Sequence, residues 1–281
     1  MIKPFSTVGI GITFSPNLEA NLFEAARLSL FFECKLILIH VGPRTDEKVK
    51  TFGTILESFV LKSLDFELVF QEGNPVDVIL DVCVHKKIDL LILGALKQES
   101  FFKYYVGSIA RKITRNANCD ILLLINPSVD RVPCQHIVVS GLDDLKTPST
   151  IATAFYIGHQ LKTQRITIVE EISDHELVIK TDDDKALKKT NIAKERMRLR
   201  EASRVMDIVQ KIDKDMKSGM LVKSQPIFGQ RGYSIGHYAQ VARADLLVMH
   251  SPSKLSFWDR LFPHDIEHIL TELPTDVLIL R

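Results

Sequence analysis

The stretch DLLILGALKQESFFKYYVGSIARKITRNANCDILLLI, residues 89–125, decides the fold, because the chain repeats it at residues 245–281 as DLLVMHSPSKLSFWDRLFPHDIEHILTELPTDVLILR. The two stretches align without a gap. Their matched residues include the pairs Asp89–Asp245 and Asp120–Asp276. A self-match at this long spacing indicates two copies of one domain, since solenoid arrays repeat roughly every 20–50 residues.

Each copy has the pattern of an α/β domain. In the first copy, the apolar runs 90–93 and 121–125 read as buried strands, and residues 107–116 between them read as a helix. Strands that are apolar on both faces are typical of parallel sheets. The remaining expected strands are 7–14, 35–41 and 66–70, alternating with expected helices at 16–32, 46–64 and 75–86. We therefore predict a doubly wound, five-stranded parallel sheet in each copy.

The second copy departs from the first in its middle. Strands are expected at 136–140, 165–169 and 221–227, and helices at 149–161 and 234–243. Residues 173–217 are strongly charged, and we interpret them as an insertion that forms one long helix overhanging the core. Its lysines and arginines could form a nucleic-acid patch. A solvated helix face is favoured, because acidic residues immediately precede them and no aromatic residues interleave with them.

The proline-rich, polar segment 126–133 reads as a linker. It divides the chain into expected domains at 1–127 and 134–281. At the start of the first expected helix, Ser15 reads as the N-cap, with Pro16 at the first helical position.

Glycines mark a candidate ligand site in the first copy. Gly94 ends an expected strand, at the edge where open α/β sheets bind ligands. Gly107 and Ser108 stand at the expected start of the following helix, where backbone N–H groups favour an anion. The alternative interpretation is that Gly107 and Ser108 only begin the helix.

These residues resemble the nucleotide motif of the universal stress protein (UspA-like) family. That motif is Gly, two residues, Gly, nine residues, Gly, then Ser or Thr. Here Gly94 and Gly107-Ser108 keep the spacing, and Lys97 stands where the middle glycine belongs. The resemblance covers nearly the whole chain. It implies a tandem member of the family with two Rossmann-like domains. It implies a pseudo-dimer of domains in which strand 121–125 lies against 277–280.

The resemblance also implies an adenine nucleotide, ATP or a relative, in the first domain. Thr13 takes the place of the family's aspartate, which contacts the adenine end of the nucleotide, and Val41 matches an adenine-contacting position. Lys97 could meet a phosphate as a point charge, or its side chain could block the turn. The nucleotide-binding residues that we predict are Thr13, Ser15, Val41, Gly94, Lys97, Gly107, Ser108 and Ile109.

In the second copy the same positions hold His250, Ser253, Pro263 and His264. Pro263 removes an N–H donor from the anion site. The apolar loop 255–262 is interpreted as filling the vacated pocket or packing against another subunit. The second domain is therefore expected to be degenerate. We predict no metal, since the paired histidines lack a third ligand at a fixed spacing.

Composition limits the remaining classes of function. The formal net charge is +1, so there is no global case for nucleic acid. No apolar run approaches the roughly 20 residues of a membrane helix, and the N-terminal residues do not resemble a signal peptide. The four cysteines are far apart in the sequence. We interpret them as buried thiols in a reducing compartment. We therefore expect a cytoplasmic protein, with a homodimer as a candidate assembly.

Catalysis finds no support in the motifs, because the sequence has neither a GxSxG elbow nor a GxxxxGK[ST] loop. Three hypotheses remain. The first is a stress-response protein that holds ATP or a related nucleotide in its first domain. The second is a member of the same family that has lost nucleotide binding and acts as an interaction scaffold. The third is an enzyme whose site the sequence does not reveal.

Overall fold

The computed structural model describes residues 3–98, 103–173, 184–230, 232–251 and 266–281. The chain divides into two compact units. Unit 1 comprises Met1–Pro133 together with Asp276–Arg281, and unit 2 comprises Cys134–Thr275. Both are α/β structures with mostly parallel strands, so the predicted fold class is confirmed.

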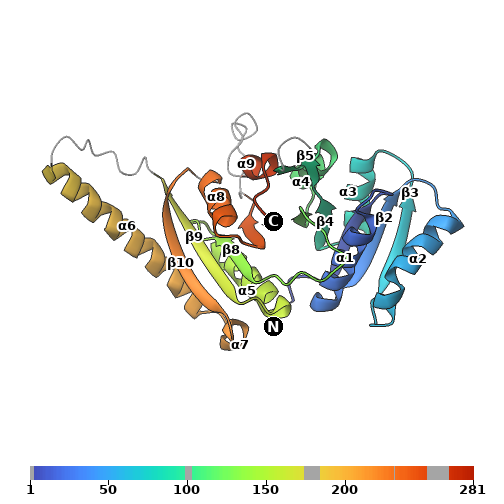
Figure 1. Cartoon of the computed structure of the whole chain (residues 1–281), viewed down its shortest axis with the longest axis horizontal. Helices are drawn as coiled ribbons and strands as arrows, with labels where there is room; N and C mark the ends of the chain where they lie inside the picture. The colour runs from blue at the N-terminus through green and yellow to red at the C-terminus, as the bar shows by residue number, and fades with distance from the viewer. Residues whose placement is uncertain (1–2, 99–102, 174–183, 231, 252–265) are drawn as a thin grey trace. The chain divides into compact units, whose positions relative to one another are not determined.

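The main sheet of unit 1 has the strand order β3-β2-β1-β4-β7-β12, and every strand except β12 is parallel to its neighbours. Helix α1 packs beside α2, and α3 packs beside α4, so that helices cover both faces of the sheet (Figure 1). The strands are β1 (Thr7–Ile12), β2 (Lys35–Val41), β3 (Phe66–Gln71), β4 (Leu90–Gly94), β7 (Asp120–Leu124) and β12 (Asp276–Leu280). The helices are α1 (Leu18–Phe32), α2 (Asp46–Val60), α3 (Pro75–His85) and α4 (Ser108–Asn116).

Unit 2 has the strand order β10-β9-β8-β11, all parallel. The strands are β8 (His136–Ser140), β9 (Arg165–Ser173), β10 (Leu221–Gly229) and β11 (Leu246–His250). The helices are α5 (Thr147–Leu161), α6 (Asp184–Gln210), α7 (Lys214–Lys217), α8 (Tyr233–Val241) and α9 (Ile266–Thr271). The long helix α6 packs along β9 and β10 (Figure 1).

The aspartate at the start of each repeated stretch joins two strands of its own unit. In unit 1, Asp89 Oδ2 accepts hydrogen bonds from the backbone N–H groups of Ser6 at 2.8 Å and Thr7 at 3.0 Å, which fixes β4 against the start of β1. In unit 2, Asp245 Oδ2 accepts from the N–H groups of Gln135 and His136, both at 2.8 Å, and does the same for β11 and β8. The charged carboxylate thus satisfies backbone N–H groups at the start of the strand, where the hydrogen-bonded ladder of the sheet begins.

The second pair of repeated aspartates holds β12 on β7. The two strands are antiparallel, with Leu278 opposite Leu122. Asp276 Oδ1 accepts from Ile125 N–H at 2.8 Å, and Asp120 Oδ1 accepts from Arg281 N–H at 2.8 Å. Each aspartate thus accepts a hydrogen bond from the N–H group of the residue that follows the partner strand. The predicted pairing of residues 121–125 with 277–280 is confirmed.

The predicted start of the first helix and the predicted single helix of the insertion need correction. Helix α1 begins at Leu18 with Asn17 at its N-cap, because Leu18 N–H closes a turn onto Ser15 O that holds Pro16 outside the helix. Helix α6 ends at Gln210, where Lys211 N–H bonds Ile208 O, and Asp213 then caps the separate α7. The long helix of the insertion is therefore interrupted.

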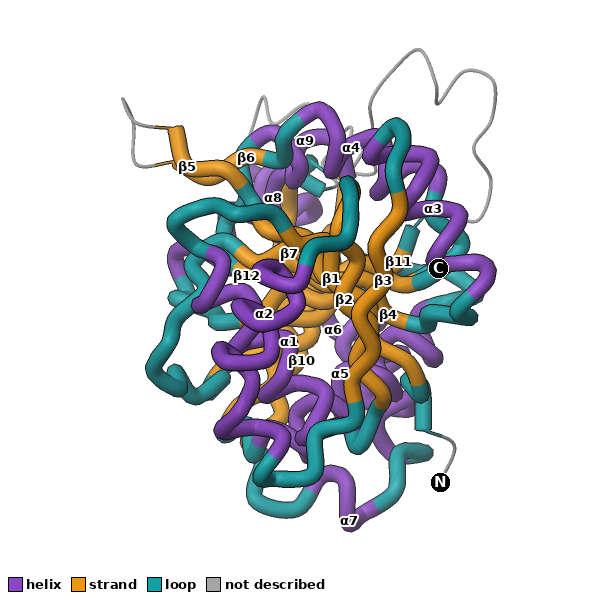
Figure 2. Tube along the Cα trace, turned by 90° about the vertical axis from the view of Figure 1, so that its right-hand side faces the viewer, coloured by secondary structure: helices purple, strands orange, loops and turns teal. Residues whose placement is uncertain are grey.

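A small hairpin follows Gly94. Its strands are β5 (Leu96–Gln98) and β6 (Lys103–Tyr105), which form a two-stranded sheet apart from the main one (Figure 2). The sequence predicted only a loop here. Among the described helices, none is long and apolar enough to cross a membrane.

Candidate functional site

The carboxyl ends of β1, β2 and β4 meet where the strand order of unit 1 reverses. In the order β3-β2-β1-β4-β7, chain connections run outward in opposite directions from β1 and β4. Open α/β sheets bind ligands at this switch point. Thr13 follows β1 and is exposed, Gly94 ends β4 and is exposed, and Val41 ends β2 and is half-buried. The register brings these three backbone positions onto neighbouring strands.

The start of α4 is presented near this edge. Gly107 is the N-cap residue in an extended conformation, and a Cβ there would lie 2.8 Å from Leu96 Cδ1, two residues beyond Gly94. Within the described residues, no side chain caps α4 and no acidic residue stands in its first turn. Ser108 and Ile109 are exposed. The first N–H groups of α4 therefore remain available to an anion.

Lys97 lies in β5, opposite Tyr104 in β6. Its backbone is therefore part of the hairpin between Gly94 and α4. Its side chain is outside the described part of the structure, so the choice between a phosphate contact and a blocked turn stays open.

Asn21 adds a polar group that the sequence did not single out. It lies one turn into α1, and its carboxamide would be 3.4 Å from a Cβ placed on Gly94. Its Oδ1 atom is buried and has no hydrogen-bond partner among the described residues. A buried acceptor without a partner costs about 1–3 kcal/mol. Gly94 thus leaves an unsatisfied polar atom at the switch point.

An aromatic cluster lies beside the ends of β1 and β2. Phe14 immediately follows Thr13, is 53% exposed, and stacks on Phe52 at 5.3 Å between ring centroids. Its ring also meets His40 edge-on at 5.6 Å, and His40 lies one residue before Val41. The cluster holds one face of Phe14 against the core and leaves apolar surface beside Thr13.

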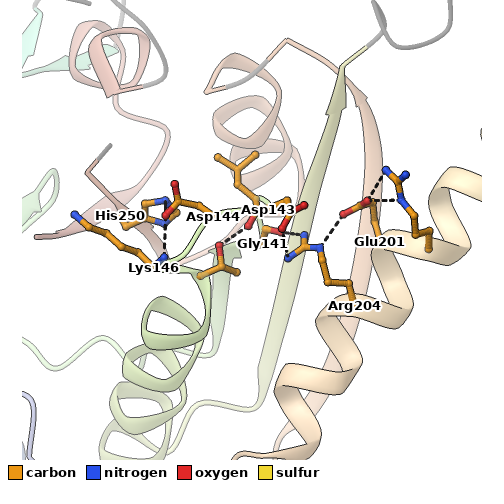
Figure 3. Close-up of polar contacts among 10 residues, drawn as sticks. Gly141, Asp143, Asp144, Lys146, Glu201, Arg204 and His250 are labelled. Atoms are coloured by element: carbon orange, nitrogen blue, oxygen red, sulfur yellow. Dashed lines mark hydrogen bonds and ion pairs between the residues drawn. The ribbon is translucent and has the colours of Figure 1, made fainter. Parts of the chain in front are cut away.

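Unit 2 fills the equivalent of the Gly94 position. By the repeat, His250 at the end of β11 corresponds to Gly94. Helices α1 and α5 have the same length and the same left-handed C-cap, so Thr150 corresponds to Asn21. His250 Nε2 lies 3.4 Å from Asp144 Oδ1 (Figure 3). Its Nδ1 lies 3.3 Å from Thr150 Oγ1. The imidazole therefore occupies the space that glycine leaves open in unit 1.

Charged residues close the rest of this edge in unit 2. Glu171 corresponds to Val41 by register, and its carboxylate accepts hydrogen bonds from the N–H groups of Gly232 at 3.0 Å and Ile235 at 2.8 Å, at the start of α8. Arg204 of α6 donates to Gly141 O at 2.5 Å, beyond the end of β8 (Figure 3). The side chains of unit 2 thus occupy the positions that remain open in unit 1.

Comparison with known proteins finds one family that part of the chain resembles. Residues 57–124 match the model of the universal stress protein family. A segment of 56 residues is 30% identical to universal stress protein MJ0531 of Methanocaldococcus jannaschii. That segment is 20% of this chain and about a third (33%) of that relative. The match to the universal stress protein family thus covers the second half of unit 1.

Solved structures agree in fold over the whole chain. Protein PA1789 of Pseudomonas aeruginosa PAO1 is similar with a TM-score of 0.71 and 16% identity, covering 98% of this chain and 92% of that one. A universal stress protein from Archaeoglobus fulgidus is similar with a TM-score of 0.64 and 13% identity, covering 98% of both chains. The chain therefore shares its α/β fold with these two solved structures.

Several of the predicted site residues lie together, and others fall outside the described structure. Thr13, Val41 and Gly94 lie at one edge, and Gly107 contacts the segment after Gly94. Ser15 lies in the turn before α1 rather than at its cap. Ser253, Pro263, His264 and the loop 255–262 lie outside the described residues. Among the described residues, no group of three or more His, Cys, Asp or Glu side chains could hold a metal ion.

Proposed function

We propose that this chain is a universal stress protein that binds ATP or a related adenine nucleotide in unit 1 and not in unit 2. The observation that carries the proposal is the contrast between Gly94 and His250. Gly94 leaves the buried Asn21 Oδ1 without a partner among the described residues, whereas His250 fills the same place and contacts Thr150. An open polar site at a switch point is suited to a ligand that can supply the missing donor.

Different residues around this site would bind the phosphate, ribose and base parts of the nucleotide. The N–H groups at the start of α4 and the Ser108 hydroxyl would bind phosphate oxygens, since a helix N-terminus favours negative charge. Asn21 Oδ1 would accept from a ribose hydroxyl or an exocyclic amine. Thr13, Val41 and the exposed ring of Phe14 would contact the base, where aromatic stacking contributes roughly 1–3 kcal/mol per base.

Calorimetric titration of the full chain with ATP tests the Asn21 contact. We expect Asn21→Ala to weaken binding about fivefold to tenfold, as the loss of a hydrogen bond worth about 1 kcal/mol predicts. Gly53→Ala is the control, because a Cβ at Gly53 would meet nothing within 4 Å and Gly53 is not among the proposed binding residues. Equal affinity for native protein and Asn21→Ala would contradict this role for Asn21.

Lys97 separates the two leading hypotheses. If its ammonium compensates for the missing glycine by contacting phosphates, Lys97→Ala should weaken ATP binding by roughly one to two orders of magnitude. Binding should then also weaken as the salt concentration rises. If the side chain blocks the turn, Lys97→Gly should instead create or tighten binding. Should the native protein, Lys97→Ala and Lys97→Gly all fail to bind an adenine nucleotide, the scaffold hypothesis becomes the better description.

A further inference from the structure

The exposed side of helix α6 carries three large apolar residues at a constant spacing. Ile192, Leu199 and Met206 stand seven residues apart and are 45%, 62% and 37% exposed. The buried residues of the same helix are Thr190, Glu201, Val205 and Val209. At about 100° per residue, the three apolar residues form nearly one line on the side of α6 that is turned away from the buried ones. We call this side the outer face of α6.

The first half of α6 is strongly basic. Residues 184–200 hold seven lysines and arginines and two acidic residues, a net charge of +5, whereas the whole chain carries +1. Arg198 pairs with Glu195 at 3.8 Å, and Arg200 pairs with Glu201 at 2.9 Å. The exposed basic residues that have no ion-pair partner among the described residues are Lys185, Lys188, Lys189 and Arg196. The outer face therefore combines apolar side chains with uncompensated positive charge.

This combination is found in only one of the two copies. Helix α2 of unit 1 holds the same place in the chain as α6, between the second and third strands of its unit. It has 15 residues against 27 in α6, with two basic and three acidic residues. The shared fold thus does not require a long basic helix here, so another role must account for the extra turns and their charge.

We propose that the outer face of α6 binds an acidic amphipathic helix of another protein. A seven-residue repeat of apolar residues is the spacing by which one helix packs along another. Lys188, Lys189 and Arg196 lie three or four residues from Ile192, so their side chains border the apolar line. Apolar side chains of the partner would cover this line, and its carboxylates would pair with the bordering cations. This proposal does not depend on nucleotide binding in unit 1.

The other possible occupants fit the outer face less well. A second copy of α6 would bring like charges together. A nucleic acid would use the charge and leave the aliphatic side chains exposed, and α6 has no aromatic residue on which bases could stack. An anionic membrane would attract the basic half of the helix only, whereas the apolar line continues to Met206, beside the exposed Asp207.

Fluorescence anisotropy of a labelled synthetic peptide tests the proposal on the full-length protein. The peptide has about four heptads, with leucine at the first and fourth positions of each heptad and glutamate at the flanking positions. A matched peptide has lysine in place of every glutamate. We expect the acidic peptide to bind with an affinity that falls as salt rises, and the lysine peptide not to bind. Failure of the acidic peptide to bind at low salt, or equal binding of the two peptides, would overturn the proposal.

Two substitutions separate the apolar and the charged part of the surface. Leu199→Ser should weaken binding of the acidic peptide roughly tenfold or more, because it removes the most exposed side chain of the apolar line. Arg196→Glu should weaken it roughly tenfold by placing a carboxylate against the carboxylates of the peptide. The matched controls are Leu61→Ser and Lys50→Glu, since Leu61 is 84% exposed and Lys50 is exposed on α2. Unchanged binding in Leu199→Ser, or equal weakening in the controls, would argue against the outer face as the binding surface.

The same variants decide between the proposed partner and the other occupants. Vesicles of phosphatidylglycerol and polyuridylate are titrated at the same salt concentration, and self-association is followed by sedimentation velocity. We expect the acidic peptide to bind more tightly than either probe and the protein not to self-associate through α6. Tighter binding of vesicles or polyuridylate that Arg196→Glu abolishes, or self-association that Leu199→Ser abolishes, would assign the face to that occupant and overturn the proposal.

Discussion

Glu170 is a buried carboxyl group whose environment is unusual for its charge. It is 2% exposed, Ser224 Oγ donates to its Oε1 at 2.9 Å, and its Oε2 has no hydrogen-bond partner among the described residues. Burial raises the pKa of Glu170 to about 7, with the nearby charge of Glu201 adding to the effect and that of Arg204 opposing it. The folded protein therefore holds this proton at pH values where the unfolded chain releases it.

The direction of the resulting pH dependence follows from linkage. The unfolded pKa is 4.5, so between about pH 4.5 and 7 the unfolded state loses the proton first, and the free energy of unfolding falls as pH rises. The full difference is on the order of 3 kcal/mol. Glu170→Gln cannot ionise, so urea unfolding of unit 2 should show similar stability to native protein at pH 5 and higher stability at pH 8. Parallel pH profiles for the two proteins would show that Glu170 stays ionised when folded.

At the residue scale, the sequence predicted the glycine positions and missed their neighbours. Motif spacing predicted Gly94 and Gly107, and the resemblance to the universal stress protein family predicted Val41. The sequence did not single out Asn21, because it stands among the apolar residues of α1. Only the alignment of α1 with α5, which pairs Asn21 with Thr150, indicates a polar position shared by the two copies. Glu171 was missed as part of a strand because a carboxylate is unusual there. Its hydrogen bonds to the start of α8 explain why the strand tolerates it.

At the element scale, the pairing of β12 with β7 depends on Asp276 and Asp120. Removing the Asp276 carboxylate leaves the part-buried Ile125 N–H group at the end of the ladder without its acceptor. A hydrogen bond to a charged group contributes about 1.5–3 kcal/mol. We expect Asp276→Ala to destabilise unit 1 by about that amount, measured by urea unfolding.

The matched control for Asp276 is Asp77→Ala, which changes an acidic residue in the first turn of α3. A surface charge near a helix N-terminus contributes only about 0.3–1 kcal/mol. Equal destabilisation by the two substitutions would argue against a special role for the aspartate of β12. Hydrogen exchange at Ile125 should also rise in Asp276→Ala and stay unchanged in Asp77→Ala.

Elements with strong periodicity were predictable, and elements set by tertiary contacts were not. Strands β2 and β7 follow continuous apolar runs, so their bounds could be read from the sequence. Strand β9 extends to Ser173 because Glu170 and Glu171 find partners in Ser224 and α8. The break after Gln210 in α6 depends on the capping of α7 by Asp213, which a helical pattern alone conceals.

At the scale of the whole molecule, the two copies keep the same residues at structural positions and differ at the ligand-facing positions. The pairs Asp89–Asp245 and Asp120–Asp276 keep the same structural roles in both copies. The ligand-facing positions differ, since His250 replaces Gly94 and Glu171 replaces Val41. Sequence comparison could reveal which residues had changed. The contacts of the replacements were needed to explain why one edge is open and the other is filled.

The measurement that tests this account most directly is the number of ATP molecules retained per chain in native mass spectrometry. The account predicts one for the native protein, none for Gly94→His, and one for His250→Ala, because Glu171 still closes the edge in unit 2. Retention of ATP by Gly94→His, two molecules per native chain, or none on the native protein would contradict it.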